Sequence, residues 1–585
     1  MTLAEPNRRD RAPAKASSTA PQPAADLGEA VVFDGRVGWL HWPARRRTSD
    51  VATTPGVVLC SAVGREEGCS HLTIRLLAEA LANIGFAVLR YDHLGAGDSL
   101  DLAEEADQLP AWRDGVALAI DLLKARTGVR KIVLCGFRSG ASLALLAAER
   151  ADALVLLAPV LNGRSWIREL RLRAAFGAAA IADEGVALES DGLRLSAATL
   201  ESLGRLDLTA PQPAPANVLG FCQNPAGAAQ LAAAVAGASN LSIRDFDGYA
   251  AFLQDPDANQ VPQEVIEATV AWLDRTYPCD AAVAAPAAPA PPLTAIRLQA
   301  RGCSEVQVSF GEGLRGVLCT PDAPGRRAVL ICNTGAEPRR GIGRFAVKAA
   351  RALAAEGVAS LRFDFAGIGE SRSADGRTHS DVFETPRGAD IKAAVGLLRQ
   401  QGFDDVTLVG VCSGAYHAFR AVLELDDIRA AFVVSPARFA LGGAAALAPN
   451  GDLGRSTAAY VDQALSPASW RRLISGKIDV AAVIRTLATR LRYRLGAGAD
   501  RARTSALQRD VEALSRRGGR LRLLMGTDDL SLDETEVSFG PRGERLARLP
   551  GMSVRIDARI DHGVAYAASQ ALVLEDLLRF MTSAR

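Results

Sequence analysis

Short apolar runs alternate with helix-length amphipathic stretches along most of this chain. Clear examples of the runs are Gly56–Cys60, Gly85–Leu89, Ile132–Cys135 and Leu154–Ala158. Such runs are typical of strands that are buried on both faces, and the stretches between them have the length of a crossover helix. The alternation therefore predicts right-handed βαβ units and mostly parallel sheets. In sheets of this kind, ligands bind at the carboxyl ends of the strands.

A segment rich in alanine and proline divides the pattern in two. Residues 279–293 hold few side chains to bury and several prolines, which predicts a semi-extended linker. A chain of 585 residues is also too long for one hydrophobic core. We expect one domain at 28–278 and a second at 294–585. The first 27 residues are polar and rich in Arg, Ala and Pro, so they are predicted to be disordered, without the apolar core of a signal peptide.

Two motifs occur once in each half. A D-x-x-G-x-G-x-S turn, preceded by Arg and an aromatic residue, spans residues 92–99 and again 364–371. A G-x-x-x-G turn follows an apolar run at 136–140 and again at 410–414. The spacing between the copies is nearly the same for the two motifs. This agreement indicates an internal duplication of a whole domain.

Charge and cysteine content narrow the classes of function. The 67 basic and 66 acidic residues leave a net charge of +1, so no global field favours nucleic acid or an anionic membrane. Nine cysteines are scattered without a C-x-x-C pair, which indicates buried thiols and not disulfides or zinc ligands. No apolar stretch has transmembrane length. We therefore expect a cytoplasmic protein without a metal, an organic cofactor or an integral membrane segment.

Both halves resemble α/β-hydrolase domains. The resemblance is based on the G-x-x-x-G turn with a strand before it and a helix after it, together with the upstream D-x-x-G-x-G-x-S turn. It implies two tandem domains with mostly parallel, doubly wound sheets. In this family the middle residue of the G-x-x-x-G turn is the nucleophile, held in a strained conformation at a helix N-terminus. The middle residue is Arg138 in the first half and Cys412 in the second.

The second half resembles the serine-aminopeptidase-like hydrolases, with cysteine in place of serine, as in the dienelactone hydrolases. The resemblance implies that Cys412 is the nucleophile, since a helix N-terminus and a protonated histidine favour a thiolate. Two alternatives remain: Cys412 is an inert buried thiol, or Ser413 is the nucleophile. In the family geometry the residue after the nucleophile donates its amide to the oxyanion, and we assign that role to Ser413.

The family also implies a histidine after the last strand and an acid after the strand before it. His562 lies just before the C-terminal helical segment, and a surface-loop histidine is the alternative. The acid is predicted to be Asp529, with Asp528 as the other choice. The order Cys, Asp, His along the chain is the order of this fold. A cluster of carboxylates in a solvated turn is the plainer explanation of these aspartates.

Further features of the second half follow from the same resemblance. The amide of Ala336, in the loop after an early strand, is expected to be the second oxyanion donor. Arg344 nearby could bind an anionic group of the substrate, although a solvated basic loop is the more common explanation of such a residue. Residues 436–520 are far more than a crossover needs, and this is where the family inserts its cap. That segment is rich in arginine. The arginines could attract an anionic substrate, but an exposed charged helix face is the more common explanation.

The first half lacks the residues of a triad. Its expected acid loop has no carboxylate, and no histidine precedes its last helix. It resembles the exosortase A system-associated hydrolases, which also carry arginine in the turn. The stretches that carry this resemblance are residues 136–141, 156–173 and 192–196. That resemblance implies a context of extracellular polysaccharide and protein sorting. If Arg138 is functional, it would bind an anion at the helix N-terminus.

Two hypotheses follow. In the first, Cys412, His562 and Asp529 catalyse acyl hydrolysis or transfer on a small ester or thioester, and the first half is a degenerate hydrolase domain. In the second, neither half is catalytic, and the protein is a paired binding module in polysaccharide assembly or sorting. Three positions filled in the correct order favour the first hypothesis. The oligomeric state stays open.

Overall fold

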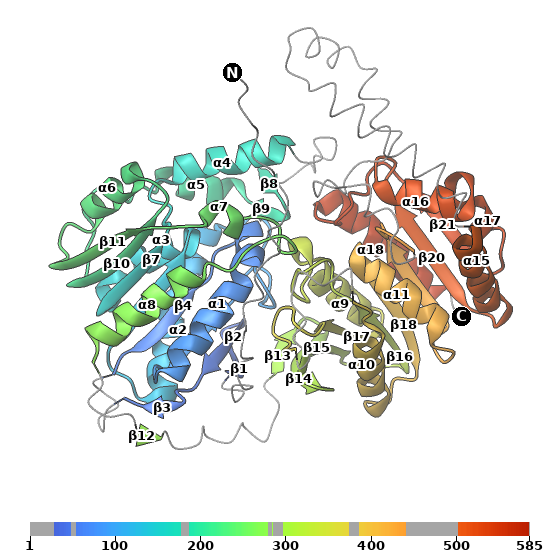
Figure 1. The fold of residues 1–585 in the computed structure, drawn as a ribbon, viewed down its shortest axis with the longest axis horizontal. Coiled ribbons are helices and arrows are strands. Elements are labelled where there is room, and N and C mark those ends of the chain that lie inside the picture. The colour runs from blue at the N-terminus through green and yellow to red at the C-terminus, as the bar shows by residue number, and fades with distance from the viewer. Residues whose placement is uncertain are drawn as a thin grey trace, which may run out of the picture.

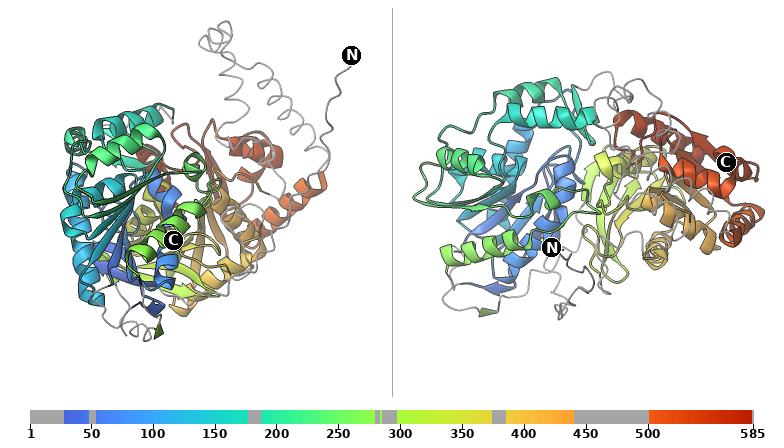
Figure 2. Two further views of the ribbon diagram at one scale, coloured as in Figure 1. Left: turned by 60° about the vertical axis from the view of Figure 1, so that its left-hand side comes forward. Right: turned by 45° about the horizontal axis from the view of Figure 1, so that its top comes forward.

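A computed structural model describes residues 28–47, 54–176, 187–278, 283–284, 297–373, 385–439 and 501–583. Two α/β units lie side by side, one made by the first half of the chain and one by the second (Figure 1). Figure 2 shows that helices cover both faces of the large sheet in each unit. Two hydrophobic clusters lie against each sheet, one on either face.

The sheet of the first half has eight strands within the described residues, in the order β1-β2-β5-β4-β6-β7-β10-β11. Strand β2 pairs antiparallel with β1 and β5, and the other pairs are parallel. The strands are β1 Gly28–Phe33, β2 Arg36–His41, β4 Gly56–Cys60, β5 Val88–Tyr91, β6 Ile132–Phe137, β7 Ala153–Leu157, β10 Asn217–Cys222 and β11 Asn240–Asp245. The helices are α1 Arg65–Asn83, α2 Gln108–Thr127, α3 Ser139–Leu146, α4 Gly163–Phe176, α5 Ala197–Arg205, α6 Pro225–Ala234, α7 Tyr249–Phe252 and α8 Gln263–Thr276. Helices α1 and α8 pack on one face, and α2, α3 and α6 pack on the other.

The sheet of the second half repeats this order after one additional strand. Its described strands run β13-β14-β15-β17-β16-β18-β19-β20-β21, antiparallel as far as β17 and parallel from there. They are β13 Arg297–Ala300, β14 Cys303–Phe310, β15 Leu314–Pro321, β16 Arg327–Ile331, β17 Ala359–Asp364, β18 Asp405–Val411, β19 Ala430–Val434, β20 Arg520–Met525 and β21 Met552–Ile556. The helices are α9 Phe345–Ala355, α10 Gly388–Gln400, α11 Ser413–Glu424, α15 Arg501–Arg516, α16 Leu530–Phe539, α17 Glu544–Ala547 and α18 Ala567–Thr582.

Both sheets have the strand order of the α/β-hydrolase fold. The apolar runs of the sequence form the central strands, and every residue of β4 and β6 is buried. A strand covered by helices on both faces has no solvent side, so its sequence is apolar throughout and does not alternate. The prediction of two α/β-hydrolase domains with mostly parallel sheets is confirmed.

The predicted linker and cap are described only in part. Within 279–293, the structure describes Val283–Ala284, which form β12 and pair antiparallel with β3 (Arg45–Arg46). Within the predicted cap at 436–520, residues 440–500 lie outside the described ranges. Residues 501–516 form α15, whose Val511 and Leu514 are buried in the core of the second half. The predicted disordered segment, 1–27, also lies outside the described residues.

Each D-x-x-G-x-G-x-S turn contributes an acidic residue to an ion pair with the other half. Arg90, at the end of β5, donates to Glu370 of the second turn at 2.6 Å. Arg362, at the equivalent position of β17, donates to Asp98 of the first turn at 3.1 Å. The two pairs are related like the two copies of a contact in a symmetric dimer, because equivalent residues exchange partners. Arg339 adds a third link, donating to Asp98 and to Asp364, each at 2.7 Å.

These contacts are buried, and they fix one half against the other. Arg362 is fully buried, and the side chain of Glu370 is 4% exposed. A buried charge that loses its partner is costly, so a network of this kind holds the arrangement in one geometry.

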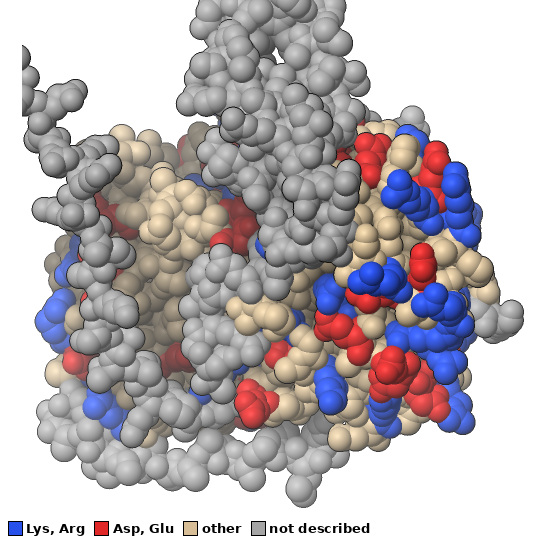
Figure 3. Space-filling model, turned by 45° about the vertical axis from the view of Figure 1, so that its right-hand side comes forward, with Lys and Arg blue, Asp and Glu red and all other residues tan. Residues whose placement is uncertain are grey.

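The outer surface carries both signs of charge. Figure 3 shows basic and acidic side chains intermixed over the second half, in keeping with a net charge of +1. Among the described helices, none combines the length and the apolar character needed to cross a bilayer.

Candidate active site

Cys412 lies at the turn between strand β18 and helix α11. Its backbone has φ 53° and ψ −114°, a conformation that costs energy for a residue with a side chain. A Cβ atom at Gly410 would lie 2.2 Å from the backbone of Gly414, and one at Gly414 would lie 2.2 Å from the carbonyl oxygen of Asn333. Both turn positions therefore need glycine. The turn raises the Cys412 sulfur at the N-terminus of α11, at the carboxyl edge of the sheet.

The structure brings the three predicted triad side chains together. The Nε2 atom of His562 lies 3.1 Å from the Cys412 sulfur, and Nδ1 of the same ring lies 3.0 Å from Oδ1 of Asp529. Asp529 is the N-cap of α16, and its Oδ1 also accepts from the amide of Ser531 at 2.9 Å. Asp528 is exposed and accepts from the hydroxyl of Thr527, its chain neighbour. The geometry thus selects Asp529 and not Asp528 as the partner of His562.

The electrostatics of the three groups are coupled. Burial tends to lower the pKa of His562, but the charges of Asp529 and Cys412 raise it well above its ordinary value. Burial tends to raise the pKa of Asp529, but His562 and the Ser531 amide bring it below the usual range. The pair His562–Asp529 therefore favours an imidazolium beside a carboxylate.

The pKa of His562 is expected to fall in a Cys412→Ala variant, because the charges of Asp529 and of the Cys412 sulfur together raise it. The ring carbon of selectively labelled histidine, followed by NMR over a pH titration, measures this pKa directly. A His562→Gln variant identifies the signal among the six histidines of the chain. A pKa of His562 that is the same with and without the Cys412 sulfur would contradict the coupling.

Ser413 holds the loop that faces Cys412. Its hydroxyl oxygen accepts a hydrogen bond from the amide of Gly335 at 2.8 Å, and its side chain is fully buried. A hydroxyl used in this way is poorly placed to attack a substrate, which argues against Ser413 as the nucleophile. Its amide is the first of α11, and the first amides of a helix have no helical acceptor. Ala336, whose amide was the other predicted donor, lines the cavity together with Cys412.

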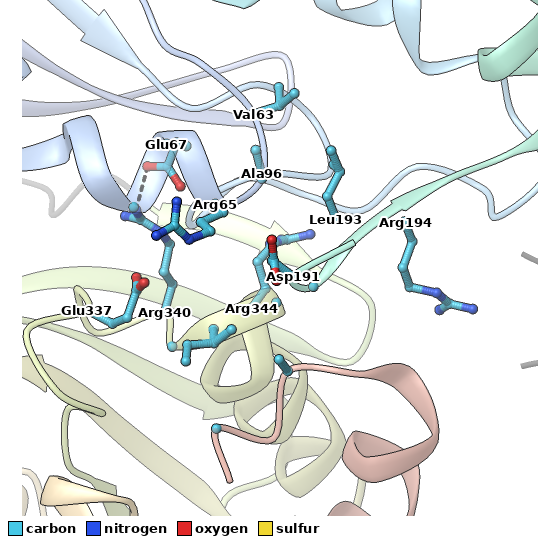
Figure 4. Close-up of a pocket in the computed structure, with 18 of the residues that line it drawn as sticks. Val63, Arg65, Glu67, Ala96, Asp191, Leu193, Arg194, Glu337, Arg340 and Arg344 are labelled. Carbon is cyan, nitrogen blue, oxygen red and sulfur yellow. Dashed lines mark ion pairs between the residues drawn. The ribbon is translucent and has the colours of Figure 1, made fainter. Parts of the chain in front are cut away.

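A cavity of about 1070 Å³ opens beside Cys412 and His562. Its walls come from both halves of the chain. Figure 4 shows Arg65 and Glu67 of α1 beside Arg340 of the second half, and Arg194 on the far side of the cavity. At the described residues, no group of three or more His, Cys, Asp and Glu side chains is arranged to hold a metal ion.

The arginines next to the predicted oxyanion loop are tied to the first half. Arg344, predicted to bind an anionic group, pairs with Asp101 and donates to the carbonyl oxygen of Gly97 at 2.9 Å. Arg340 pairs with Glu67 at 2.6 Å. These side chains are buried. The two arginines are therefore neither solvated nor unpaired, because carboxylates of the first half neutralise them.

The corresponding turn of the first half has the same shape and different contacts. Arg138 has φ 51° and ψ −116°, close to the values of Cys412. Its guanidinium donates to Glu66 at 2.9 Å and to Glu169. These two carboxylates already neutralise the guanidinium of Arg138, which was predicted to bind an anion. Next to the turn, Phe137 packs against Phe252 with ring centroids 4.7 Å apart, where the second half has its histidine loop.

Comparison with known proteins places the family match in the first half. The family model described as serine aminopeptidase, S33, matches residues 57–187. The resemblance to this family was predicted for the second half, whereas the match lies within the first half, around the turn that carries Arg138. No curated protein matches the chain.

Three similar solved structures share the fold of this chain at low sequence identity. A serine hydrolase without a lid from Xanthomonas campestris is 15% identical, with a TM-score of 0.29, and the match covers 44% of this chain and 98% of that one. Est1E from Butyrivibrio proteoclasticus with bound ferulic acid is 16% identical, with a TM-score of 0.30 and 42% and 99% covered. The esterase Pf2001 of Pyrococcus furiosus is 15% identical, with a TM-score of 0.29 and 48% and 93% covered.

Proposed function

We propose that the second half hydrolyses an ester or thioester, or transfers its acyl group, with Cys412 as the nucleophile. The observation that supports this most is the continuous chain of contacts from the Cys412 sulfur through both ring nitrogens of His562 to Asp529. Each member of that chain has the role that acyl transfer needs: nucleophile, base and acid, and orienting carboxylate.

The reaction follows from these positions. An imidazolium at hydrogen-bond distance and the N-terminus of α11 both favour a thiolate at Cys412. The thiolate attacks the carbonyl carbon, and the amides of Ser413 and Ala336 stabilise the oxyanion that forms. The carbon–oxygen or carbon–sulfur bond to the leaving group then breaks, and His562 gives the leaving group a proton. An acyl group remains on Cys412.

The second stage returns the enzyme to its starting state. His562, now neutral, takes a proton from a water molecule, whose oxygen attacks the acyl carbon. The bond between the acyl carbon and the Cys412 sulfur then breaks, which releases a carboxylic acid and restores the thiolate. If a different hydroxyl or thiol enters, the acyl group is transferred. Asp529 keeps the ring of His562 in one orientation and stabilises its charged form in both stages.

We propose no catalysis for the first half. Arg138 occupies the nucleophile position, and Glu66 and Glu169 neutralise it. The link to extracellular polysaccharide implied by the sequence remains part of this proposal as a context for the substrate. The alternative, a paired binding module without catalysis, gives no reason for Asp529 and His562 to align on the sulfur of Cys412.

The proposal predicts an acyl-enzyme. A panel of short-acyl esters and thioesters, incubated briefly with the native protein, is expected to add the mass of the acyl group to a peptide that contains Cys412. Intact-mass and peptide mass spectrometry detect this adduct. The His562→Ala variant should not accumulate it, because the thiolate loses its partner. Hydrolysis without any adduct, or an adduct on another residue, would remove Cys412 from the proposed role.

A further inference from the structure

The cavity beside Cys412 is closed on one side by the first half. Leu193 and Arg194, from the hairpin of β8 (Leu188–Ser190) and β9 (Leu193–Leu195), line it together with Arg65 and Glu67 of α1. The second half contributes Cys412 and His562 to the same cavity. A domain that lacks a triad therefore supplies side chains at the proposed catalytic site of its neighbour.

The hairpin is docked on the loop that carries His562. Glu189 accepts a hydrogen bond from the amide of Ala567, five residues after His562, at 2.9 Å. At the tip of the hairpin, a Cβ atom on Gly192 would lie 2.5 Å from the Cα atom of Gly343. Because the two backbones touch there, the position needs glycine. Figure 1 shows β8 and β9 at the boundary between the halves.

A second contact brings α1 against the predicted oxyanion loop. A Cβ atom on Gly68 would lie 2.8 Å from the carboxylate of Glu337, the residue after Ala336. Glu67, one residue earlier on α1, pairs with Arg340 at 2.6 Å. Figure 4 shows these side chains meeting across the cavity. The first half thus contacts the neighbourhood of both the base and the oxyanion loop.

We propose that the first half is the specificity wall of the catalytic cavity, with Leu193 as a residue that limits the size of the substrate. The ion pairs between the two turns keep the wall at a fixed distance from Cys412. The effect of the wall on catalysis rests on the proposed function. The position of the wall beside Cys412 does not depend on that function.

The charges in the cavity indicate the class of substrate. The cavity is lined by charged side chains of both halves: Arg65, Glu67, Asp191 and Arg194 from the first, and Glu337 and Arg340 from the second. A long apolar acyl chain placed among these groups would remove water from them without replacing its hydrogen bonds, which is costly. We therefore expect a polar ester or thioester, with hydroxyl or charged groups on the part that reaches the hairpin.

Access to Cys412 tests the wall without any need for turnover. N-ethylmaleimide and fluorescein maleimide carry the same reactive group and differ in bulk, and peptide mass spectrometry gives the labelling rate at Cys412 for each. In Leu193→Trp the bulky reagent should react about tenfold more slowly than with the native protein, because the added ring fills the cavity. The small reagent should be affected much less. Leu193→Ala should have the opposite effect on the bulky reagent.

Leu172→Trp is the matched control, since Leu172 is 57% exposed on α4 and does not line the cavity. It should leave both labelling rates unchanged. If Leu193→Trp behaves like Leu172→Trp, or slows both reagents equally, the wall is excluded. This result does not depend on whether Cys412 is catalytic.

Turnover then tests the class of substrate. The native protein should have a higher kcat/KM for glycerol monoacetate than for propyl acetate, which has the same acyl group on an apolar alcohol. A preference for propyl acetate would overturn the polar assignment. If no acyl-enzyme forms but Leu193→Trp still slows the bulky maleimide more than the small one, the proposed function is wrong and the wall is retained.

Discussion

Replacing Cys412 by alanine is expected to reduce the hydrolysis of short-acyl thioesters by about a thousandfold or more, since its sulfur is the group that the proposed mechanism acylates. His562 and Asp529 would keep their contact, but neither can replace the sulfur as a nucleophile. Steady-state kinetics on the native protein and the variant measure the effect. The loss should appear in kcat and in kcat/KM alike, because the thiolate acts in the transition state and contributes little to binding.

Cys332→Ala is the matched control. Cys332 follows β16 and is slightly more buried than Cys412, and burial raises its pKa to about 12, so it stays a neutral thiol. Its removal should leave turnover nearly unchanged. Equal activity in Cys412→Ala and the native protein would place the nucleophile elsewhere in the chain.

The fold could be predicted from the sequence because its signals are local. Apolar runs such as Gly56–Cys60 form buried strands, and the glycines at 410 and 414 mark a turn whose geometry permits nothing larger. The approach of Cys412, His562 and Asp529 was also predicted, since the order of strands brings the ends of β18, β20 and β21 to one edge of the sheet. The sequence does not distinguish Asp528 from Asp529, because the side chains of adjacent residues point in different directions and only the folded structure shows which one faces His562.

The contacts between the halves could not be predicted. The repeated turns at 92–99 and 364–371 indicated a duplication, but a motif does not reveal what its charged residues contact. Arg344 looked like a solvated or ligand-binding arginine because Asp101, its partner, is 243 residues away in the chain. The stretch at 192–196 carries no sign of its position in the sequence beyond a resemblance to a family. Its place at the cavity depends on how the halves dock, and pairing over such distances has no local signal.

Glu370→Ala is expected to lower the free energy of unfolding by about 3–5 kcal/mol, because it leaves Arg90 buried without its carboxylate. Arg90 is 5% exposed, and the same carboxylate lies 2.9 Å from Nε2 of His71. Urea titration followed by far-UV circular dichroism measures the loss. Asp404→Ala is the control: it removes the partner of Arg326 on the surface, where water solvates both groups, and should leave the titration unchanged.

Substitutions in the other ion pair, between Arg362 and Asp98, show whether each pair stabilises only its own turn or holds the two halves together. Asp98→Ala removes a carboxylate that Arg362 and Arg339 share, but Arg362 keeps Glu305 and Arg339 keeps Asp364, so alone it should cost less than Glu370→Ala. If both pairs serve to hold the halves together, the double variant should cost clearly less than the two single losses combined, since the second substitution acts on an interface already open. Cys412 should then also react faster with fluorescein maleimide, because the wall has moved away. Additive losses with unchanged labelling would show instead that each pair stabilises only its own turn.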